Sequence, residues 1–306
     1  MKIRIAICCF VVAFAATTMY AQTPTDAFMM PPGQICLAAL YSNSSWSQYW
    51  QGTQKLTNGN VGTLTTQTIT PMFALGVIDN VNVLAGINYI SSQPSSGTLI
   101  GTAGWQDAGV WVKYEPLNRT FGPGTIHGLA TFGFSAPVGN YVPEYPYSIG
   151  LGCTNTSLTG ILEYDHESGV YVRGYAGYNE RGITTISEDY YFTTQQYYSN
   201  QVIIPEALNY AFTAGYRPAN GQWFAEAFYN GQHTNGGFDI RPWQAPFPSN
   251  QMNYSLIGAD GHYFPPVLKG LGVLAEVSDV IDGRNVGQSF TVTGGLTYQF
   301  GIWGNN

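Results

Sequence analysis

The feature that most constrains the fold is a two-residue alternation of apolar and polar side chains that recurs along the chain after residue 33. In Val81–Tyr89 the odd positions are Val, Val, Ala, Ile and Tyr, whereas Asn82, Gly86 and Asn88 occupy even positions. A strand of this kind has one apolar and one polar face. We count about twelve such segments, each close to the ~10 residues with which a tilted strand crosses a bilayer. Their predicted starts lie near residues 34, 62, 81, 104, 125, 155, 170, 206, 222, 251, 268 and 288.

The connections between these segments alternate between short and long. Short connections fall at 79–80, 118–124, 166–169, 218–221 and 265–266, and long ones at 51–60, 91–103, 137–148, 180–205, 232–251 and 279–287. Outer-membrane barrels have short periplasmic turns and longer outer loops. The sequence therefore predicts an all-β fold, a transmembrane antiparallel up-and-down barrel of about twelve strands spanning residues 34–306. Residues 22–33 are expected to form a short periplasmic N-terminal segment, too short for a plug domain.

The composition agrees with a wall that faces lipid. Charged residues make up 9% of the chain and aromatic residues 15%, whereas soluble proteins contain roughly 25% charged residues. After residue 21 no apolar run approaches the ~20 residues of a spanning helix. Aromatic residues lie near the predicted strand ends, where headgroups favour rings with a polar tip. They include Trp46, Tyr49, Trp50, Trp105, Tyr114, Tyr216, Trp223 and Tyr298.

Residues 1–21 have the pattern of a secretory signal peptide. Lys2 and Arg4 precede an apolar core, Ile5–Ala16, and cleavage is expected after Ala21. An ordinary core helix is the alternative, but the run is short and Pro- and Thr-rich chain follows it. We therefore expect export and a location in the bacterial outer membrane, with outer-membrane lipid as a partner. The exported chain retains Cys36 and Cys153, which we expect to be free thiols because they map to opposite barrel ends.

Charged residues on the polar parity are predicted to face the barrel lumen. The candidates that line it are Asp107, Lys113, Glu163, Arg173, Arg217, Glu226 and Glu276. Ion pairs that hold the wall and a path for solute are both open interpretations. About twelve strands enclose a narrower lumen than the 16–18-stranded porins, which favours a narrow or gated path. With 11 Lys and Arg against 18 Asp and Glu, the chain has no basic patch for nucleic acid.

The longest predicted loop is rich in aromatic side chains. Tyr190, Tyr191, Phe192, Tyr197 and Tyr198 lie beside amides and carboxylates. Such rings can stack on sugars or aromatic solutes, so these residues are candidates for solute binding at the loop. The alternative is that the loop folds over the barrel mouth or settles among the headgroups.

Catalysis finds little support in the sequence. A few outer-membrane barrels are hydrolases, and His233 with Asn235-Gly236 resembles the outer-membrane phospholipase motif. The nucleophilic Ser expected two residues after the His is replaced by Asn235, and Thr234 would point to the opposite face of a strand. The histidines show no metal spacing and no phosphate-binding loop is visible. We expect neither an enzyme nor a cofactor.

The last segment resembles the terminal strand by which outer-membrane barrels are recognised for assembly. Phe290, Val292, Gly294, Leu296, Tyr298 and Phe300 share one parity, and residues 301–306 follow the final aromatic. The barrel-assembly machinery is therefore an expected partner, and the oligomeric state is left open.

The stretch Gly104–Tyr114 resembles a strand of the outer-membrane family named for the meta-pathway of phenol degradation. Members carry a Gly-Asp followed after five residues by Lys-Tyr, and here Asp107, Lys113 and Tyr114 match whereas Gln106 replaces the Gly. The resemblance implies a channel or transporter for small, apolar or aromatic solutes. The alternative is a non-conducting barrel that binds at the surface or serves a structural role.

Overall fold

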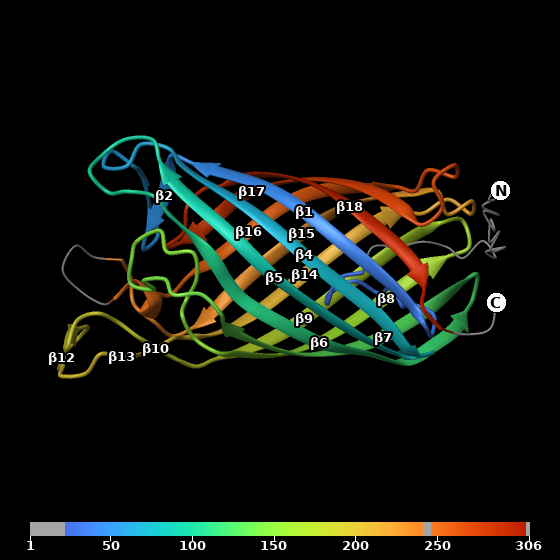
Figure 1. The fold of residues 1–306 in the computed structure, drawn as a ribbon, viewed down its shortest axis with the longest axis horizontal. Coiled ribbons are helices and arrows are strands. Elements are labelled where there is room, and N and C mark those ends of the chain that lie inside the picture. Colours follow the sequence, from blue (N-terminus) through green and yellow to red (C-terminus); the bar gives the residue numbers. More distant parts are fainter. Residues whose placement is uncertain (1–21, 241–245, 304–306) are drawn as a thin grey trace, which may run out of the picture.

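Twelve antiparallel strands close into a single barrel in the computed structural model, which describes residues 22–240 and 246–303 (Figure 1). The wall consists of β1 (Gln34–Trp46), β4 (Leu64–Ile78), β5 (Val81–Pro94), β6 (Thr102–Phe121), β7 (Gly124–Pro137), β8 (Asn155–His166), β9 (Val170–Arg181), β14 (Glu206–Tyr216), β15 (Trp223–Asn235), β16 (Asn253–Tyr263), β17 (Leu271–Arg284) and β18 (Phe290–Gly301). Each strand pairs with its neighbours along this series, and β1 pairs with β18 to close the ring. Closure leaves the wall without a free edge, as the interior of a bilayer demands.

The strands begin within a few residues of their predicted starts, and the largest difference is at β17, which begins at Leu271 rather than near 268. β6 runs to Phe121, past the expected start of its turn at Asn118. The pairing of β6 with β7 shifts between Tyr114 and Leu117, which places Pro116 at a bulge, where a residue without an N–H is tolerated. The turn itself is Gly122-Pro123, with Gly122 in the left-handed region at φ 57°.

The predicted alternation of apolar and polar residues matches the structure, in which successive side chains point alternately outward and inward. In β18, Val292, Leu296 and Tyr298 are exposed on the outer surface while Thr293 and Thr297 are buried. The pairing of β16 with β17 shifts between Ser255 and Leu256, which lie opposite Asp282 and Val280, so the extra residue belongs to β17. Beyond that shift, Ile257 and Tyr263 are exposed outside, and Asp260 lies on the opposite parity, facing the interior.

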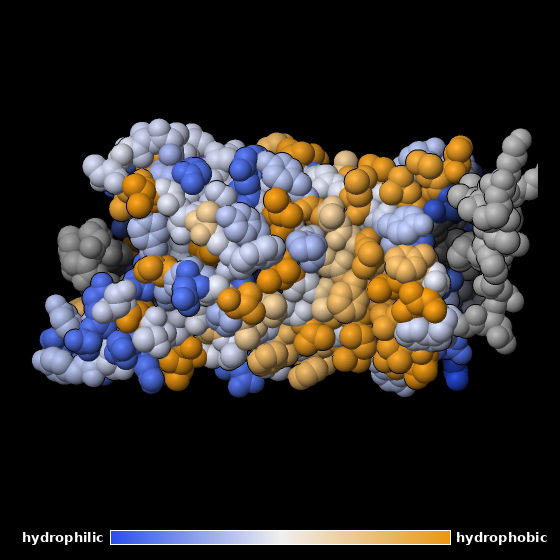
Figure 2. Space-filling view, viewed as in Figure 1, coloured by the Kyte–Doolittle hydropathy of each residue, from blue (hydrophilic) through white to orange (hydrophobic). Residues whose placement is uncertain are grey.

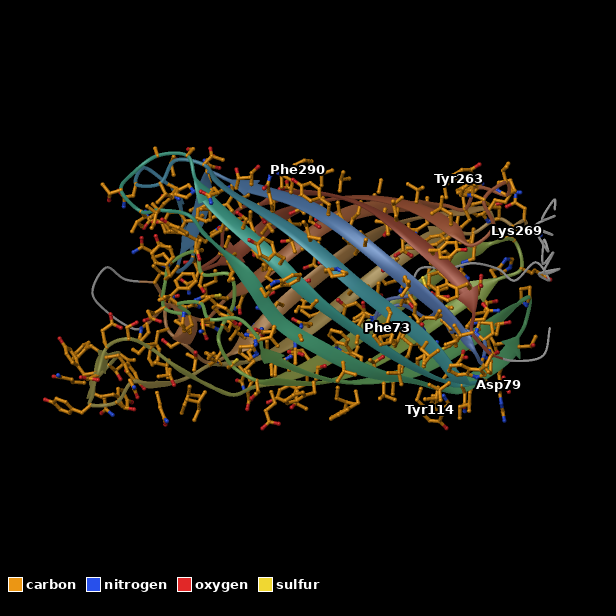
Figure 3. All side chains as sticks on the ribbon, viewed as in Figure 1. Phe73, Asp79, Tyr114, Tyr263, Lys269 and Phe290 are labelled. Carbon is orange, nitrogen blue, oxygen red and sulfur yellow. The ribbon has the colours of Figure 1, made fainter. Side chains whose placement is uncertain are left out.

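Apolar side chains gather on the wall and polar ones at the end with the long connections, which we call the loop end (Figure 2). The opposite, turn end carries the short turns, among them those of Asp79 and Lys269 (Figure 3). Tyr114 and Tyr263 point outward close to that end, as expected of an aromatic belt. Trp46 and Tyr49, however, line a cavity at the loop end, and Trp50 is buried.

Three small hairpins extend from the loop end. They are β2 (Gln48–Gln51) with β3 (Gln54–Thr57), β10 (Ile183–Thr185) with β13 (Gln201–Ile203), and β11 (Tyr191–Phe192) with β12 (Gln196–Tyr197). A short 3₁₀ helix, η1 (Phe247–Ser249), lies in the connection before β16. In the described part of the chain, no helix is long and apolar enough to cross a membrane.

Candidate solute path through the barrel

Residues 22–33, the N-terminal segment, lie inside the turn-end half of the barrel (Figure 1). The segment makes hydrogen bonds with two neighbouring strands, β6 and β7. Lys113 on β6 is fully buried, and its Nζ donates to Asp26 Oδ1 at 2.8 Å, to the Asp26 carbonyl at 2.9 Å and to the Phe28 carbonyl at 3.4 Å. Thr131 on β7 donates to the Pro24 carbonyl at 2.9 Å. The described chain has no folded plug domain, but this extended segment fills part of the lumen.

Apolar side chains on the inner wall also pack against the N-terminal segment. Three clusters form, in which Met30 packs with Cys36, Ala74 and Leu84, Ala27 packs with Leu129 and Ile161, and Phe28 packs with Phe224 and Phe264. Gly76 on β4 allows the closest approach, because a Cβ there would lie 2.1 Å from the Pro31 carbonyl oxygen. The segment therefore replaces water against inward-facing apolar side chains.

Four of the predicted lumen residues meet in one charged network beside this segment. Arg173 on β9 donates to Glu163 at 3.2 Å and to Glu226 at 2.7 Å. Arg217 lies 2.8 Å from Asp165 and 3.5 Å from Glu163. Glu226 also accepts a hydrogen bond from the Tyr171 hydroxyl at 2.5 Å. Buried charges remain stable only when paired and hydrogen-bonded in this way.

The remaining three predicted lumen residues lie in other surroundings. Lys113 holds the N-terminal segment, as described above. Glu276 on β17 lines a cavity in the turn-end half of the lumen. Asp107 lies near the loop end, where it accepts a hydrogen bond at 2.7 Å from Tyr141 of the 138–154 loop. Burial and this carboxylate raise the pKa of Tyr141, so Tyr141 stays a donor and Asp107 anchors the loop.

Above the charged network, the lumen is lined by neutral hydroxyl and amide groups. Thr70 donates to Asn88 at 2.7 Å, and Asn88 donates to Gln106 at 3.2 Å. On the other side of β1, Ser42 and Thr293 are hydrogen-bonded at 2.8 Å. Two charged groups, Asp107 and Arg181, lie near the same end, and Arg181 donates to Gln232 at 3.1 Å.

A cavity of about 930 Å³ lies at the loop end, and we call it the vestibule. Apolar and aromatic side chains from the wall and the loops line it. They include Trp46, Tyr49, Leu64, Ile90, Tyr147, Ile149, Ile186, Phe247 and Met252. Its volume is within the ~300–1,000 Å³ range of small-molecule pockets.

Three of the five predicted loop residues line this vestibule: Tyr190, Tyr191 and Phe192. Tyr197 stacks on Tyr191, with ring centroids 5.0 Å apart and an interplanar angle of 14°. Tyr198 is 84% exposed and is not among the residues that line the cavity. The loop extends from one side of the loop end (Figure 1), and part of its aromatic surface lies against the vestibule.

A single amide ties the loops around the vestibule together. Asn285, at φ 57°, accepts hydrogen bonds on Oδ1 from the Gly52 N–H at 2.7 Å and the Ile240 N–H at 3.0 Å. Its Nδ2 donates to the Gln251 carbonyl at 2.8 Å. Arg284 next to it pairs with both Asp239 oxygens, at 2.7 and 2.8 Å. The β2–β3 hairpin and the connection before β16 are thereby held on the end of β17.

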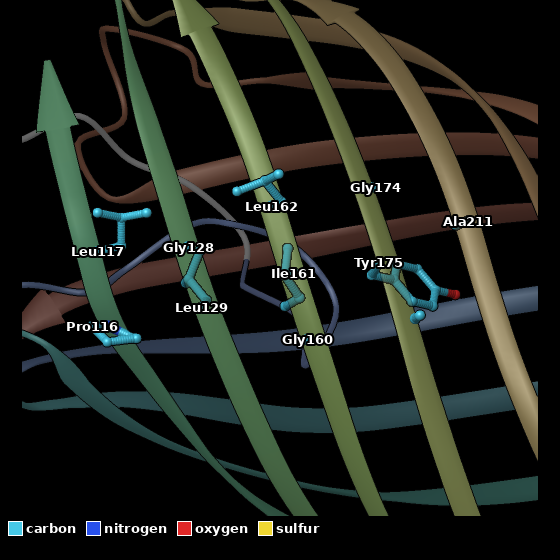
Figure 4. A pocket seen from close by; sticks show the side chains of 11 residues that line it. Pro116, Leu117, Gly128, Leu129, Gly160, Ile161, Leu162, Gly174, Tyr175 and Ala211 are labelled. Carbon is cyan, nitrogen blue, oxygen red and sulfur yellow. The ribbon is translucent and has the colours of Figure 1, made fainter. Parts of the chain in front are cut away.

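A second hollow lies on the outer wall, where glycines leave the backbone bare (Figure 4). Gly128, Gly160 and Gly174 lie on the outward parity of β7, β8 and β9, and Gly128 lies between Leu117 and Leu162 on the neighbouring strands. A Cβ added at Gly160 would meet no atom within 4 Å. On the inner face of the same strands, Leu129 and Ile161 pack against the N-terminal segment.

Groups typical of hydrolases and metal sites are not assembled in the described residues. His233 is exposed and Thr234 is fully buried, so the two point to opposite faces of β15 as expected. No three His, Cys, Asp or Glu side chains of the described ranges come together as metal ligands. Cys36 and Cys153 are free and buried, in agreement with the prediction of free thiols.

Comparison with solved structures shows the same fold in an outer-membrane channel. The COG4313 outer membrane channel from Pseudomonas putida F1 matches with a TM-score of 0.72 and 12% identity, over 92% of this chain and all (100%) of that one. The transport unit of the autotransporter AIDA-I from Escherichia coli (TM-score 0.49, 10% identity, 90% and 95% covered) and the translocator domain of NalP from Neisseria meningitidis (0.48, 12%, 89% and 90%) are too distant to carry an argument. No family model and no curated protein sequence matches the chain.

The N-terminal segment is the part of the lumen that the sequence analysis missed. A signal was present, because the inward parity near the turn end carries Leu84, Leu129, Ile161, Phe224 and Leu274, all buried. A water-filled lumen would have polar side chains at these positions. Apolar residues on both parities indicate that something packs on the inside as well.

Proposed function

We propose that this protein is an outer-membrane channel or transporter for small, apolar or aromatic solutes. The observation that carries the proposal is the vestibule, an aromatic-lined cavity of about 930 Å³ that lies above a polar lumen in a closed barrel. Flat rings such as Tyr190, Tyr191 and Phe192 favour solutes with an apolar face. The resemblance of Gly104–Tyr114 to the phenol meta-pathway family supports the same class of solute.

The proposal includes export and assembly. Cleavage of the predicted signal peptide after Ala21 lies outside the described residues; it would make Gln22, which is buried in the lumen, the first residue. The exposed apolar stripe of β18, with Phe290 and Leu296, suits recognition by the barrel-assembly machinery. The short turns would face the periplasm and the vestibule the exterior, in the usual orientation of such barrels.

Planar-bilayer recordings test the proposal. We expect small ionic currents from the purified barrel and reversible block by benzyl alcohol or phenol. A variant that lacks residues 23–31 should carry larger currents, because the segment and its contacts with Lys113 leave the lumen. The absence of ionic current from both proteins at all voltages would contradict the channel hypothesis.

The second candidate is a non-conducting barrel that binds ligands at the cell surface. It is favoured by the N-terminal segment, which fills part of the turn-end half of the lumen and is held by a buried ion pair. On this hypothesis the full-length protein binds aromatic solutes in the vestibule, yet liposomes that contain it take up none. Solute uptake measured alongside equilibrium binding separates the two functions.

A further inference from the structure

Three carboxyl groups lie in one row on the inner wall of the turn-end half. Glu226 on β15 is directly opposite Asp260 on β16, and Asp260 is directly opposite Glu276 on β17. All three line a cavity of about 210 Å³. Like charges on paired strands repel, so such a row is stable only if something compensates it.

One cation, Arg173, lines this cavity and pairs with Glu226 of the row, and no cation of the described ranges pairs with Glu276. Arg173 is bound by Glu163 and Glu226, Arg217 faces Glu163 and Asp165, and Lys113 holds Asp26. Glu276 has neither an ion-pair nor a hydrogen-bonding partner in the described ranges. The row is therefore left with a local excess of negative charge.

Asp260 is the member of the row that indicates a ligand. Its side chain is only 10% exposed, and its Oδ1 is buried without a hydrogen-bond partner. The His262 Nε2 lies 3.5 Å from this oxygen, too far for a good hydrogen bond. Asp260 also interacts with the neighbouring Glu226 carboxyl. A buried acceptor without a donor is costly, which is why native proteins rarely leave one unsatisfied.

Aromatic rings complete the lining of this cavity. The Phe228 ring covers Gly258, two residues before Asp260, because a Cβ at Gly258 would lie 2.3 Å from the Phe228 Cζ. Phe224 stacks on His262 with centroids 4.2 Å apart. Ring faces beside carboxylates attract organic cations. The Asp, Glu and His side chains do not come together as metal ligands in the described residues, which favours an organic cation over a metal ion.

We propose that Asp260 and Glu276 form a binding site for a small organic monocation, an ammonium or amidinium group, and thereby make the lumen selective for cations. The volume of about 210 Å³ is below the ~300 Å³ of the smallest drug-sized pockets, so the ligand is small. The binding site stands on its own geometry, whereas its role in transport rests on the proposed function. A solute with an aromatic ring and an amine fits both the vestibule and this site.

Binding is tested in detergent by calorimetry with two probes of similar shape, benzylammonium and the neutral benzyl alcohol. We expect benzylammonium to bind at least about tenfold more tightly, because it adds ion-pair and cation–π attraction. The variant Asp260→Asn/Glu276→Gln should lose this difference. Asp79→Asn, which removes an exposed carboxylate at the turn end, should keep it. Equal affinity of the wild type for both probes would overturn the proposal.

Selectivity is tested in a planar bilayer under a potassium chloride gradient. The reversal potential should favour K⁺ in the wild type and move towards zero in the double variant but not in Asp79→Asn. A conducting barrel with no cation preference overturns this inference and leaves the channel standing. A silent barrel that still prefers benzylammonium overturns the channel and leaves the site. If the double variant fails to fold, as judged by its mobility on a gel before and after heating, Asp260→Glu and Glu276→Asp, which retain the charge, should retain the preference.

Discussion

The ammonium of Lys113 on β6 and the Oδ1 of Asp26 in the N-terminal segment are 2.8 Å apart, with side chains 0% and 8% exposed. The pair holds the N-terminal segment on β6. Phe28 of the same segment packs against Phe224 and Phe264, on the opposite side of the ring. Together these contacts fix where the segment crosses the lumen.

Asp26→Asn should release the N-terminal segment. Removing one partner of a buried ion pair costs about 3–5 kcal/mol, because the other charge stays buried and unpaired. The readout is labelling of an Ala27→Cys reporter, buried in the wild type, with an impermeant maleimide. Labelling should be faster in Asp26→Asn, and Asp26→Asn/Lys113→Met should restore part of the protection. Unchanged labelling would mean that the apolar contacts alone hold the segment.

Gly76→Val should displace the segment by volume alone. The added Cβ would lie 2.1 Å from the Pro31 oxygen and 2.6 Å from the Met30 oxygen, both backbone atoms that cannot rotate away. Gly160→Val is the matched control, since a Cβ at Gly160 meets nothing within 4 Å. We expect faster Ala27→Cys labelling and larger bilayer currents only in Gly76→Val, with the heat-dependent gel shift of a folded barrel kept in both variants.

Arg173→Met should destabilise the barrel wall. It leaves Glu226 buried without a cation and Glu163 with only the more distant Arg217, at a cost of about 3–5 kcal/mol. Arg284→Met, by contrast, removes a partly exposed pair with Asp239 and should cost roughly 1 kcal/mol or less. Guanidinium unfolding followed by tryptophan fluorescence measures both changes. Similar midpoints for the two variants would contradict the structural role of the network.

Tyr191→Ala should weaken the binding of aromatic solutes in the vestibule. Loss of a ring that contacts the solute removes about 0.5–1.5 kcal/mol beyond the effect of lost area, or roughly a few-fold to more than tenfold in Kd. Tyr198→Ala is the control, because its ring is exposed and does not line the vestibule. Binding of phenol to the purified barrel, followed by calorimetry, should fall only in the first variant.

Cys153 should react slowly with thiol reagents in the folded protein. Burial raises the pKa of its thiol, so at pH 8 even less of it is the reactive thiolate than for a free cysteine. Ellman's reagent should find no rapid thiol in the native barrel, and after denaturation of a chain that begins at Gln22 it should find two, Cys36 and Cys153. A reaction in the native state at the rate of free cysteine would show that the 138–154 loop opens often.

The wall was predictable from sequence because lipid imposes a strict rule on it. Every second residue of a strand such as β18 must be apolar, and the unequal lengths of the connections identify the two ends. The sequence predicted that Arg173, Glu163 and Glu226 face the lumen, because parity gives the side to which a residue points. It did not predict that they pair, because parity does not give the register between strands. The position of the N-terminal segment was not predictable by alternation, because residues 22–33 have no periodic pattern. The residues that pack against them, such as Leu84 and Ile161, were visible as apolar residues at inward positions. The sequence did not show which segment packs there.

The vestibule also depends on contacts that periodicity does not describe. Trp46 looks like a belt residue by its position at a strand end, yet its ring lies against Gly287, where a Cβ would approach within 2.5 Å. Such a placement follows from how the long loops fold back on the mouth. Loop conformation depends on individual hydrogen bonds between distant residues, such as those of Asn285, and the sequence carries no repeated signal for them.

The Asn285 amide bridges the β2–β3 hairpin and the connection before β16, so one side chain joins these two parts of the loop end. A molecule that displaces the hairpin on entry should therefore also displace the connection before β16. Amide hydrogen exchange at Gly52, Ile240 and Gln251 should accordingly rise in concert in Asn285→Ala. Opening at this side of the barrel mouth would then be cooperative between the two parts, rather than local to one loop.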